Sequence, residues 1–340
     1  MHNIYGFTRL DLEQYFLSIG EKKFKATQVY EWLYDKKIKD FDEITNIKKD
    51  VIDKLKEDFN LNKIEISKVE KDSDTHKFLF KLSDNNYIEA VVMTHDYGNS
   101  LCVSSEVGCN MSCAFCESGR RKKVRNLETY EMVEQLYLIE NEYNLHITSV
   151  VVMGIGEPFD NYNNVINFLK IINDAKAFAI GARHITVSTC GLVPKILEFS
   201  ELPYQFNLAL SLHAPNDEIR NKLMPVNKVY NISKVMDAIK SYYEKTNRRV
   251  TIEYVMLKGV NDTLDNAEEL ANLLKGMNVY VNLIPYNETS HIEFKKSEKE
   301  NILKFGQVLQ SFGITVTIRK EFGSKISAAC GQLRSKEEKV

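Results

Sequence analysis

Three cysteines stand close together in the chain at a spacing that suits a metal centre. Cys109, Cys113 and Cys116 form a C-x3-C-x2-C triplet, which brings three thiolates into one short loop. Electron-transfer iron–sulfur clusters normally take four cysteines, so three ligands leave one iron of a cubane open for a substrate or cofactor. The triplet therefore predicts a [4Fe–4S] cluster with one open iron.

Two other interpretations compete with the cluster. One is a structural zinc site with a distant fourth ligand, and the other is a chance group of cysteines in a loop. Zinc-binding cysteines usually form C-x2-C pairs at both ends of the site. The chain has no second pair of this kind and no His-x3-His, so zinc is the weaker interpretation.

A glycine-rich segment, GIGEP at residues 154–158, offers a second part of a binding site. Its glycines allow a ligand to approach the backbone closely, and the Glu157 carboxylate can accept hydrogen bonds from an amino group. Alone, such a segment is most often only a turn. Its place after the second strand of the array described next favours a ligand-binding role.

Strand-like and helix-like segments alternate through most of the chain. Apolar, β-rich runs predict strands at residues 101–105, 149–153, 184–188, 206–211, 250–256 and 279–284. Helical spacing of apolar residues predicts helices near 128–143, 161–174, 192–199, 231–245 and 263–275, followed by a helix near 297–311 and a strand near 314–318. Such alternation indicates a parallel sheet, and six units fall short of a closed eightfold barrel. We expect an α/β fold, a partial (β/α)6 barrel.

Residues that could do chemistry follow these strands repeatedly. They are Cys109 after the first strand, 154–158 after the second, 188–191 after the third, 211–213 after the fourth and Asn287 after the sixth. In such sheets, ligands bind at the carboxyl ends of the strands. We therefore expect five loops to meet at one site.

The chain before residue 99 has a different pattern. Helical spacing of apolar residues up to about residue 60 predicts a small helical module, and the runs 77–82 and 87–92 predict a hairpin across the turn 83–86. The expected domains are an N-terminal helical accessory domain at 1–62, a linker with the hairpin at 63–98, the partial barrel at 99–334 and a charged tail at 335–340.

The composition limits where the protein is expected in the cell and how it could bind RNA. The formal net charge of -2 carries no global nucleic-acid signature, so any RNA contact must come from a local basic patch. We find no apolar run long enough for a membrane span and no signal-peptide pattern, so we expect a cytoplasmic protein. In a reducing cytosol, four clustered cysteines out of six indicate metal ligands or catalytic thiols.

A basic segment directly follows the cysteine triplet. Its five cations are Arg120, Arg121, Lys122, Lys123 and Arg125. Cations at the mouth of a site are typical of a phosphate-contacting patch, which favours RNA as a ligand. A solvated charge run is the alternative.

Longer motifs resemble one known family. They are LCVSS at 101–105, GIGEP at 154–158, SLHAPN at 211–216, LMPVN at 223–227, EYVM at 253–256, NLIPYN at 282–287 and AACGQL at 328–333. Together they resemble the RlmN/Cfr family of rRNA adenine methyltransferases, which are radical S-adenosylmethionine (SAM) enzymes. The resemblance covers nearly the whole chain. The chain departs from the family at Glu117-Ser118-Gly119 within the segment 117–123, where a small-residue stretch such as Ala-Ser-Thr is usual.

The resemblance implies the cofactors and their ligands. Cys109, Cys113 and Cys116 would hold the cluster, SAM would chelate the open iron, and one electron would cleave it to a 5'-deoxyadenosyl radical. Two SAM molecules would be used per turnover. The implied SAM contacts are Gly156, Glu157, Ser188, Ser211, His213 and Asn287.

The resemblance also implies a two-step methyl transfer. Cys330 would take a methyl group from one SAM, and the second SAM would abstract hydrogen from it so that the carbon radical adds to adenine. Glu89 would accept a proton. Cys102 would attack the sulfur of Cys330, leaving a disulfide as the product departs. Without the resemblance, Glu89 would be an exposed strand carboxylate, and each cysteine could be a buried, inert thiol.

The implied activity is methylation of C2 of an adenosine in 23S rRNA, with tRNA as a second candidate substrate. The segments 156–158 and 211–220 favour the RlmN-like branch over Cfr-type methylation of C8, which gives antibiotic resistance. A rival of another class is a non-catalytic, metal-containing RNA-binding protein. We also expect a flavodoxin- or ferredoxin-type electron donor and a monomeric enzyme.

Overall fold

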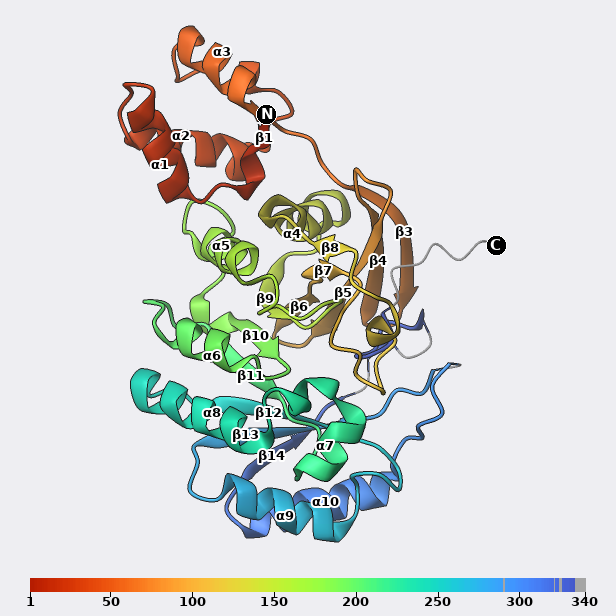
Figure 1. Ribbon diagram of the computed structural model, residues 1–340. Coiled ribbons are helices and arrows are strands. Elements are labelled where there is room, and N and C mark those ends of the chain that lie inside the picture. The colour runs from red at the N-terminus through yellow and green to blue at the C-terminus, as the bar shows by residue number, and fades with distance from the viewer. Residues whose placement is uncertain (290, 321, 324–325, 334–340) are drawn as a thin grey trace.

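The computed structural model describes residues 1–289, 291–320, 322–323 and 326–333, and one ten-stranded sheet organises them (Figure 1). Seven of its strands pair in parallel with one another. They are β6 (Gly98–Cys102), β9 (Ile147–Val152), β10 (Ile185–Thr189), β11 (Asn207–Ser211), β12 (Val250–Met256), β13 (Val279–Pro285) and β14 (Thr315–Ile318). The predicted strands and their parallel arrangement are confirmed, although β6 begins earlier than expected and ends at Cys102.

The helices between these strands also lie where apolar periodicity places them. They are α4 (Thr129–Tyr143), α5 (Tyr162–Asn173), α6 (Val193–Ser200), α8 (Ile232–Thr246), α9 (Leu264–Leu274) and α10 (Lys299–Ser311). Local signals fix their ends: the Asn231 side chain caps α8, which stops at left-handed Asn247 with φ 53. In the described part of the chain, none of the helices is long and apolar enough to span a membrane.

One helix was not predicted. The helix α7 (Asp217–Leu223) has only seven residues, too few to show apolar periodicity. Asn216 caps it by accepting a hydrogen bond from the Ile219 amide at 2.9 Å. This helix follows β11 directly and so lies at the carboxyl end of the sheet, where the site is expected.

The predicted hairpin is present, but it is not a separate linker. The strands β4 (Thr75–Lys81) and β5 (Tyr87–His95) pair in antiparallel fashion, and β3 (Glu65–Asp72) adds to β4. β5 in turn pairs with β6, so the three strands extend the main sheet at its edge. The domain boundaries stay a prediction, and the charged tail 335–340 lies outside the described residues.

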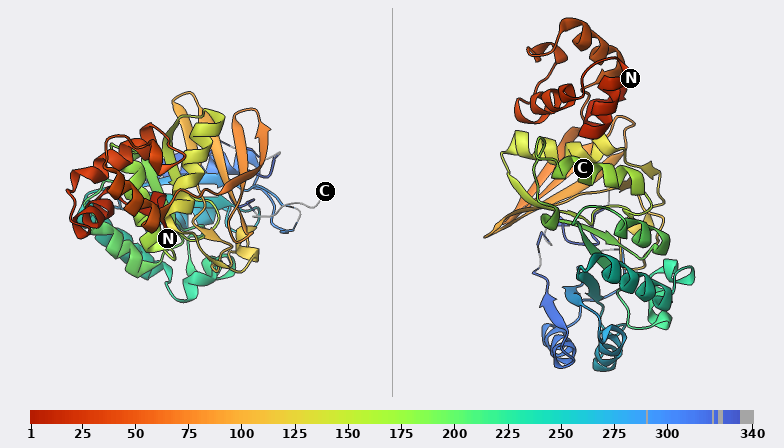
Figure 2. Two further views of the ribbon diagram at one scale, coloured as in Figure 1. Left: turned by 90° about the horizontal axis from the view of Figure 1, so that it is seen from above. Right: turned by 90° about the vertical axis from the view of Figure 1, so that its left-hand side faces the viewer.

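The N-terminal helices form the expected small module. α1 (Arg9–Ser18), α2 (Phe24–Tyr30) and α3 (Lys49–Asp58) lie at one end of the molecule, opposite α9 and α10 (Figures 1 and 2). Tyr5 packs against Tyr137 of α4 with ring centroids 5.1 Å apart, and Arg9 pairs with Asp174 at 2.9 Å. Buried aromatic contacts thus join the module to the helical side of the sheet.

Candidate active site

The cysteine triplet lies in a loop whose two ends are pinned together. The short strands β7 (Glu106–Val107) and β8 (Arg125–Asn126) pair at its base. Gly108 has φ +77, and a Cβ there would lie 2.4 Å from the carbonyl oxygen of Lys122, so only glycine fits. The Cys116 amide donates to the Cys113 carbonyl at 3.1 Å. The loop is therefore tight, as the spacing of the triplet predicts.

The three cysteines line one cavity at the carboxyl ends of the strands. Burial raises the pKa of Cys109 to about 12, and it also raises the pKa values of Cys113 and Cys116. Unpaired thiols of this kind ionise when a metal binds them. Five of the six predicted SAM contacts line the same cavity, namely Gly156, Glu157, Ser188, Ser211 and His213.

The described residues contain no group of three His, Cys, Asp or Glu side chains close enough to share one metal ion. A zinc site needs its sulfur ligands about 2.3 Å from a single centre. A cubane cluster spreads its cysteines over separate irons, so its ligands need not converge on one point. The three thiols that line one cavity are the donor set that a cubane cluster with one open iron requires.

Glu157 is buried and fixed by the backbone around it. Its two carboxylate oxygens accept hydrogen bonds from the amides of Phe159 at 3.1 Å and Cys190 at 2.8 Å. Its own amide donates to the Glu106 carboxylate at 3.0 Å. Burial raises the pKa of Glu157, and the side chains of Thr189 and Cys190 also hydrogen-bond its carboxyl group. An ammonium group of a ligand beside it would favour its ionised form.

His213 is prepared to donate a hydrogen bond. Its Nδ1 accepts from the Val255 amide at 3.0 Å, which places the proton on Nε2. Burial lowers the pKa of His213 to about 3, so the ring is neutral. The ring edge packs on Phe115 of the cysteine loop at a centroid distance of 4.9 Å. The hydroxyl oxygens of Ser188 and Ser211 lie 3.3 Å apart beside it.

Cys102 and Cys330 line a second cavity together, and Cys330 lines the first as well. Cys102 ends β6 opposite Val91 of β5, and burial raises its pKa to about 12. Asn287 also lines this second cavity, and its amide donates to the Cys330 carbonyl at 3.4 Å. The structure thus places this predicted SAM contact beside the predicted methyl carrier.

All six cysteines are free thiols. The disulfide that the resemblance implies between Cys102 and Cys330 as the product departs is therefore not supported by this structure.

The segment that carries Cys330 rests on the cysteine loop. The Glu117 amide donates to the Gly331 carbonyl, and the Ser118 hydroxyl donates to the Leu333 carbonyl, both at 2.9 Å. Glu117 and Ser118 belong to the stretch that departs from the family pattern. The segment that follows the third cluster cysteine is thus hydrogen-bonded to the segment that follows Cys330.

Glu89 lies on β5, two residues before Val91, and so faces the same side of the sheet as Cys102. Its carboxylate lies 3.5 Å from the Lys77 ammonium, and its side chain is almost fully buried. Glu89 is not an exposed strand carboxylate, as its strand position alone would suggest. It is not among the residues that line either cavity.

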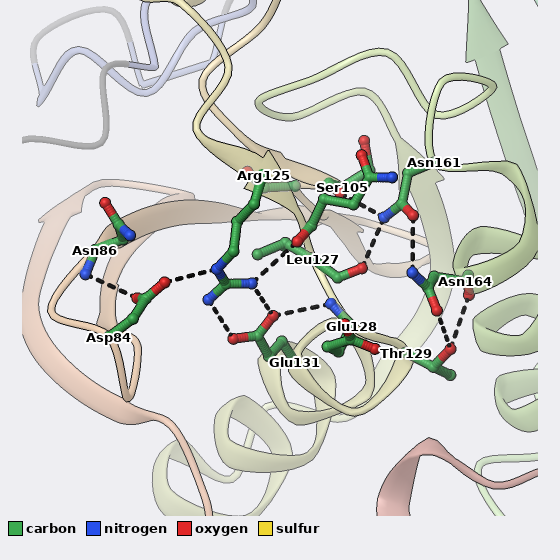
Figure 3. Close-up of polar contacts among 12 residues, drawn as sticks. Asp84, Asn86, Ser105, Arg125, Leu127, Glu128, Thr129, Glu131, Asn161 and Asn164 are labelled. Carbon is green, nitrogen blue, oxygen red and sulfur yellow. Dashed lines mark hydrogen bonds and ion pairs between the residues drawn. The ribbon is translucent and has the colours of Figure 1, made fainter.

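The cations of the basic segment fall into two groups, those paired with carboxylates within the fold and those that are more accessible. The Lys123 ammonium lies 2.7 Å from both Glu106 and Asp160. Arg125 binds Asp84 at the turn of the hairpin and Glu131 at the start of α4 (Figure 3). These two cations therefore stabilise the fold.

The other cations of the segment are more accessible. The Arg120 side chain is 47% exposed, with Glu117 3.7 Å away, and Lys122 is exposed too. Arg121 is half-buried. Only part of the predicted patch is thus available to a phosphate.

Three charged residues near the cavities were not predicted from the sequence. Arg319, directly after β14, lines both cavities, and Glu253 of β12 lines the first. The Glu253 carboxylate accepts from Asn282 at 2.9 Å, and burial raises its pKa. The third is Arg220 of α7, which is fully buried. A signal did exist for Glu253, because it is the only charged residue in an otherwise uncharged strand.

Comparisons with family models and with known proteins agree with one another along the whole chain. A family model described as "Ribosomal RNA large subunit methyltransferase N-terminal domain" matches residues 2–61, and one described as "Radical SAM superfamily" matches residues 103–274. The Enterococcus faecalis "Probable dual-specificity RNA methyltransferase RlmN" is 54% identical over 99% of this chain and 97% of its own length. A namesake from Acholeplasma laidlawii is 52% identical over 98% of both chains.

A solved structure is similar throughout. The crystal structure of a radical SAM methyltransferase from Sphaerobacter thermophilus has a TM-score of 0.91 and 39% sequence identity, and covers 99% of this chain and 100% of that one. The similarity therefore includes the N-terminal module, the sheet and the C-terminal segment alike.

Proposed function

Since the chain belongs to the RlmN family of radical SAM RNA methyltransferases, we propose that it methylates C2 of an adenosine in 23S rRNA and in tRNA. The observation that supports this best is the position of Cys330, which borders both the cavity with the cysteine triplet and the cavity with Cys102. A methyl carrier needs access to the cofactors on one side and to the base on the other.

Membership of the radical SAM superfamily implies a [4Fe–4S] cluster and SAM. Cys109, Cys113 and Cys116 would hold the cluster, while Glu157 would receive the amino group of SAM and His213 would donate to an acceptor on it. When bound, this pair supplies the one-electron cleavage of SAM that allows hydrogen abstraction. We further propose that two SAM molecules are used per turnover.

The carbon C2 of adenine is not a nucleophile, so it cannot take a methyl group from SAM directly. We propose that the Cys330 thiolate first attacks the methyl carbon of SAM, which forms an S-methyl thioether and releases S-adenosylhomocysteine. Cys330 is exposed as a residue, in contrast to buried Cys102, and it borders both cavities. The thioether then carries the methyl carbon to the base.

Release of the product needs a base and a second thiol. We propose that Glu89 accepts the proton lost from the adenine carbon, since it faces the same side of the sheet as Cys102. We propose that the Cys102 thiolate then attacks the sulfur of Cys330. The S–S bond between the two cysteines forms as the bond between that sulfur and the transferred carbon breaks, the carbon keeps the electron pair and takes up a proton to become the methyl group, and the electron donor later reduces the disulfide. Burial holds the Cys102 thiol protonated, whereas the nearby Arg319 lowers its pKa and so favours the reactive thiolate.

The Cfr-type alternative would methylate C8 of the same adenosine. The two outcomes are separated by incubating the anaerobically reconstituted protein with a 23S rRNA fragment, SAM and a low-potential reductant. Mass mapping of the modified nucleoside should give 2-methyladenosine. An 8-methyladenosine product would overturn the C2 assignment, and RNA binding without any methylation would favour the non-catalytic RNA-binding protein.

The remaining partners are proposed from the chemistry. A one-electron reduction of the cluster requires a donor of low potential, for which we propose a flavodoxin- or ferredoxin-type protein. We propose that the enzyme acts as a monomer, because one chain supplies all the residues assigned here. A parallel reaction with an anticodon stem-loop of tRNA tests the second substrate.

A further inference from the structure

A buried arginine lies next to the cofactor cavity, and the proposed mechanism does not use it. Arg220 of α7 is 0% exposed. Among the described residues, every acceptor of a hydrogen bond from its guanidinium is a neutral oxygen. The acceptors are Leu212 O at 3.2 Å, Asn227 Oδ1 at 2.8 Å, Tyr230 O at 3.2 Å, Cys190 O at 2.6 Å and Ser211 O at 3.5 Å.

These bonds satisfy the donors of Arg220 but do not neutralise its charge. Among the described residues, no carboxylate forms an ion pair with it. The nearest acidic link is indirect: Asn227 accepts from Arg220 and donates to the Asp217 carboxylate at 2.8 Å. Buried charges in proteins are normally paired, because a buried charge without a counter-ion is costly. The position of Arg220 therefore calls for an anion nearby.

The helix that carries Arg220 is docked on the cysteine loop. The carbonyl at the end of α7, on Leu223, accepts from the amide of Ala114 at 2.9 Å, and Ala114 directly follows Cys113. Cys190, whose carbonyl Arg220 binds, packs in one apolar cluster with Cys113.

Other charged groups around this position are few. Glu157 contacts the same residue, Cys190, from the cavity side, through the Cys190 amide. A SAM ammonium bound to Glu157 would neutralise that carboxylate. The cluster, with three thiolate ligands, would then be the anion that balances Arg220.

We propose that Arg220 is the counter-charge of the iron–sulfur cluster and raises its reduction potential. This inference rests on the proposed cluster at Cys109, Cys113 and Cys116. Reduction adds a negative charge to the cluster, and a nearby cation in a low-dielectric interior stabilises the reduced state more than the oxidised one. Net charge around a cluster is one of the factors that set its potential.

The test compares two substitutions of Arg220 in the full-length, reconstituted protein. Arg220→Gln removes the charge and keeps part of the hydrogen bonding, whereas Arg220→Lys keeps the charge. Redox titration followed by electron paramagnetic resonance gives the potential of each. We expect Arg220→Gln to lower the ratio of reduced to oxidised cluster about tenfold at a fixed reductant, or about 59 mV for one electron. Arg220→Lys should stay near the wild-type value.

A second variant, Asp217→Asn, provides a test that does not depend on whether Arg220→Gln folds. Asp217→Asn removes the nearest indirect negative charge while its remaining side-chain oxygen can still accept from Asn227 and from the Ile232 amide. It should raise the potential, in the direction opposite to Arg220→Gln. If Arg220→Gln does not bind four irons, the direction in which Asp217→Asn changes the reduction potential decides whether charge at this position acts on the cluster.

The outcomes separate this inference from the proposed function. Wild-type protein that binds no iron would contradict the cluster itself. If the wild type binds iron but Arg220→Gln leaves the reduction potential unchanged, only the role of Arg220 is overturned. Where Arg220→Gln loses the cluster, an unchanged potential in Asp217→Asn has the same meaning. A shift in Arg220→Lys as large as that in Arg220→Gln would also overturn it, because the hydrogen-bond geometry rather than the charge would then set the potential.

Discussion

The two cavities that meet at Cys330 are built in different ways. The cofactor cavity is lined by loops that follow successive parallel strands, and its polar groups are fixed by buried backbone bonds, as at Glu157 and His213. The cavity shared with Cys102 is bounded by the C-terminal segment, which a few side-chain and backbone bonds hold against the cysteine loop.

This difference indicates that the two cavities have different functions in the proposed reaction. A radical reaction needs a fixed geometry between cluster, SAM and the atom that loses hydrogen, and rigid strand ends supply such geometry. A methyl carrier must meet SAM and RNA in turn, and it lies on a segment attached at the surface of that framework. Changes to the first cavity should therefore abolish cofactor chemistry, whereas changes to the second should spare it.

The largest effect is expected at the triplet. Cys113→Ala should abolish iron binding, because two remaining thiolates cannot hold the cubane. Iron and sulfide analysis after anaerobic reconstitution measures this, with about four irons per chain expected for the wild type. Cys190→Ala is the matched control, since Cys190 packs beside Cys113 without an assigned role and should keep the iron. Stoichiometric zinc without iron in protein purified without air would contradict the cluster.

Glu157→Gln should weaken SAM binding roughly tenfold to a hundredfold, since hydrogen bonds to charged groups contribute about 1.5–3 kcal/mol. The measurement is the Kd for SAM in iron-loaded protein. Glu134→Gln serves as the control, because Glu134 is also a buried carboxylate that accepts a backbone amide, from Ile64 at 2.8 Å, yet lines neither cavity. Equal SAM affinity in Glu157→Gln and wild type would remove Glu157 from the binding site.

Ser118→Ala tests the attachment of the C-terminal segment. Loss of one hydrogen bond of about 0.5–1.5 kcal/mol should reduce RNA methylation roughly twofold to tenfold. Ser118 also lines the cofactor cavity, but its hydroxyl donates to the Leu333 carbonyl, so SAM affinity should stay near the wild-type value. Ser200→Ala, which removes a similar hydroxyl-to-carbonyl bond in α6, should have no such effect. A parallel loss of SAM affinity in Ser118→Ala would show that the two cavities are not separable in this way.

The smallest effect concerns the basic segment. Changing Arg120 and Lys122 to Ser should lower the slope of log affinity for RNA against log salt by about 1–2, as each lost phosphate contact removes roughly 0.7–0.9. Lys123→Ser should leave the slope unchanged, because Lys123 is occupied by Glu106 and Asp160. Filter binding over a salt series measures both. An unchanged slope in the double variant would make the segment a solvated charge run.

Local patterns in the sequence were sufficient for most of the fold. Alternating apolar runs and helical spacing located the parallel strands and the long helices, because burial of one face imposes those periods. They did not locate α7, which is too short to show a period. Nor did they show that the hairpin joins the sheet, since the pairing of β5 with β6 depends on a contact between two strands rather than on either strand alone.

The site was predictable where its residues follow strands. The triplet and the segment 154–158 fall at strand ends, and the structure brings them to one cavity. The ion pairs of Arg125 were not predictable, because Asp84 lies on the distant hairpin. The roles of Arg220 and Arg319 likewise depend on which backbone surrounds them in space, about which their neighbours in the sequence say nothing.

The most direct test of the account is the Cys102→Ala variant in the complete reaction with RNA, SAM and reductant. If Cys330 carries the methyl carbon and Cys102 frees the product, this variant should accumulate RNA joined covalently to Cys330. The linked species should survive denaturing electrophoresis, map to Cys330 by peptide mass analysis, and be absent when Cys330 is also changed to Ala. A Cys102→Ala enzyme that methylates RNA without any linked species would contradict the account.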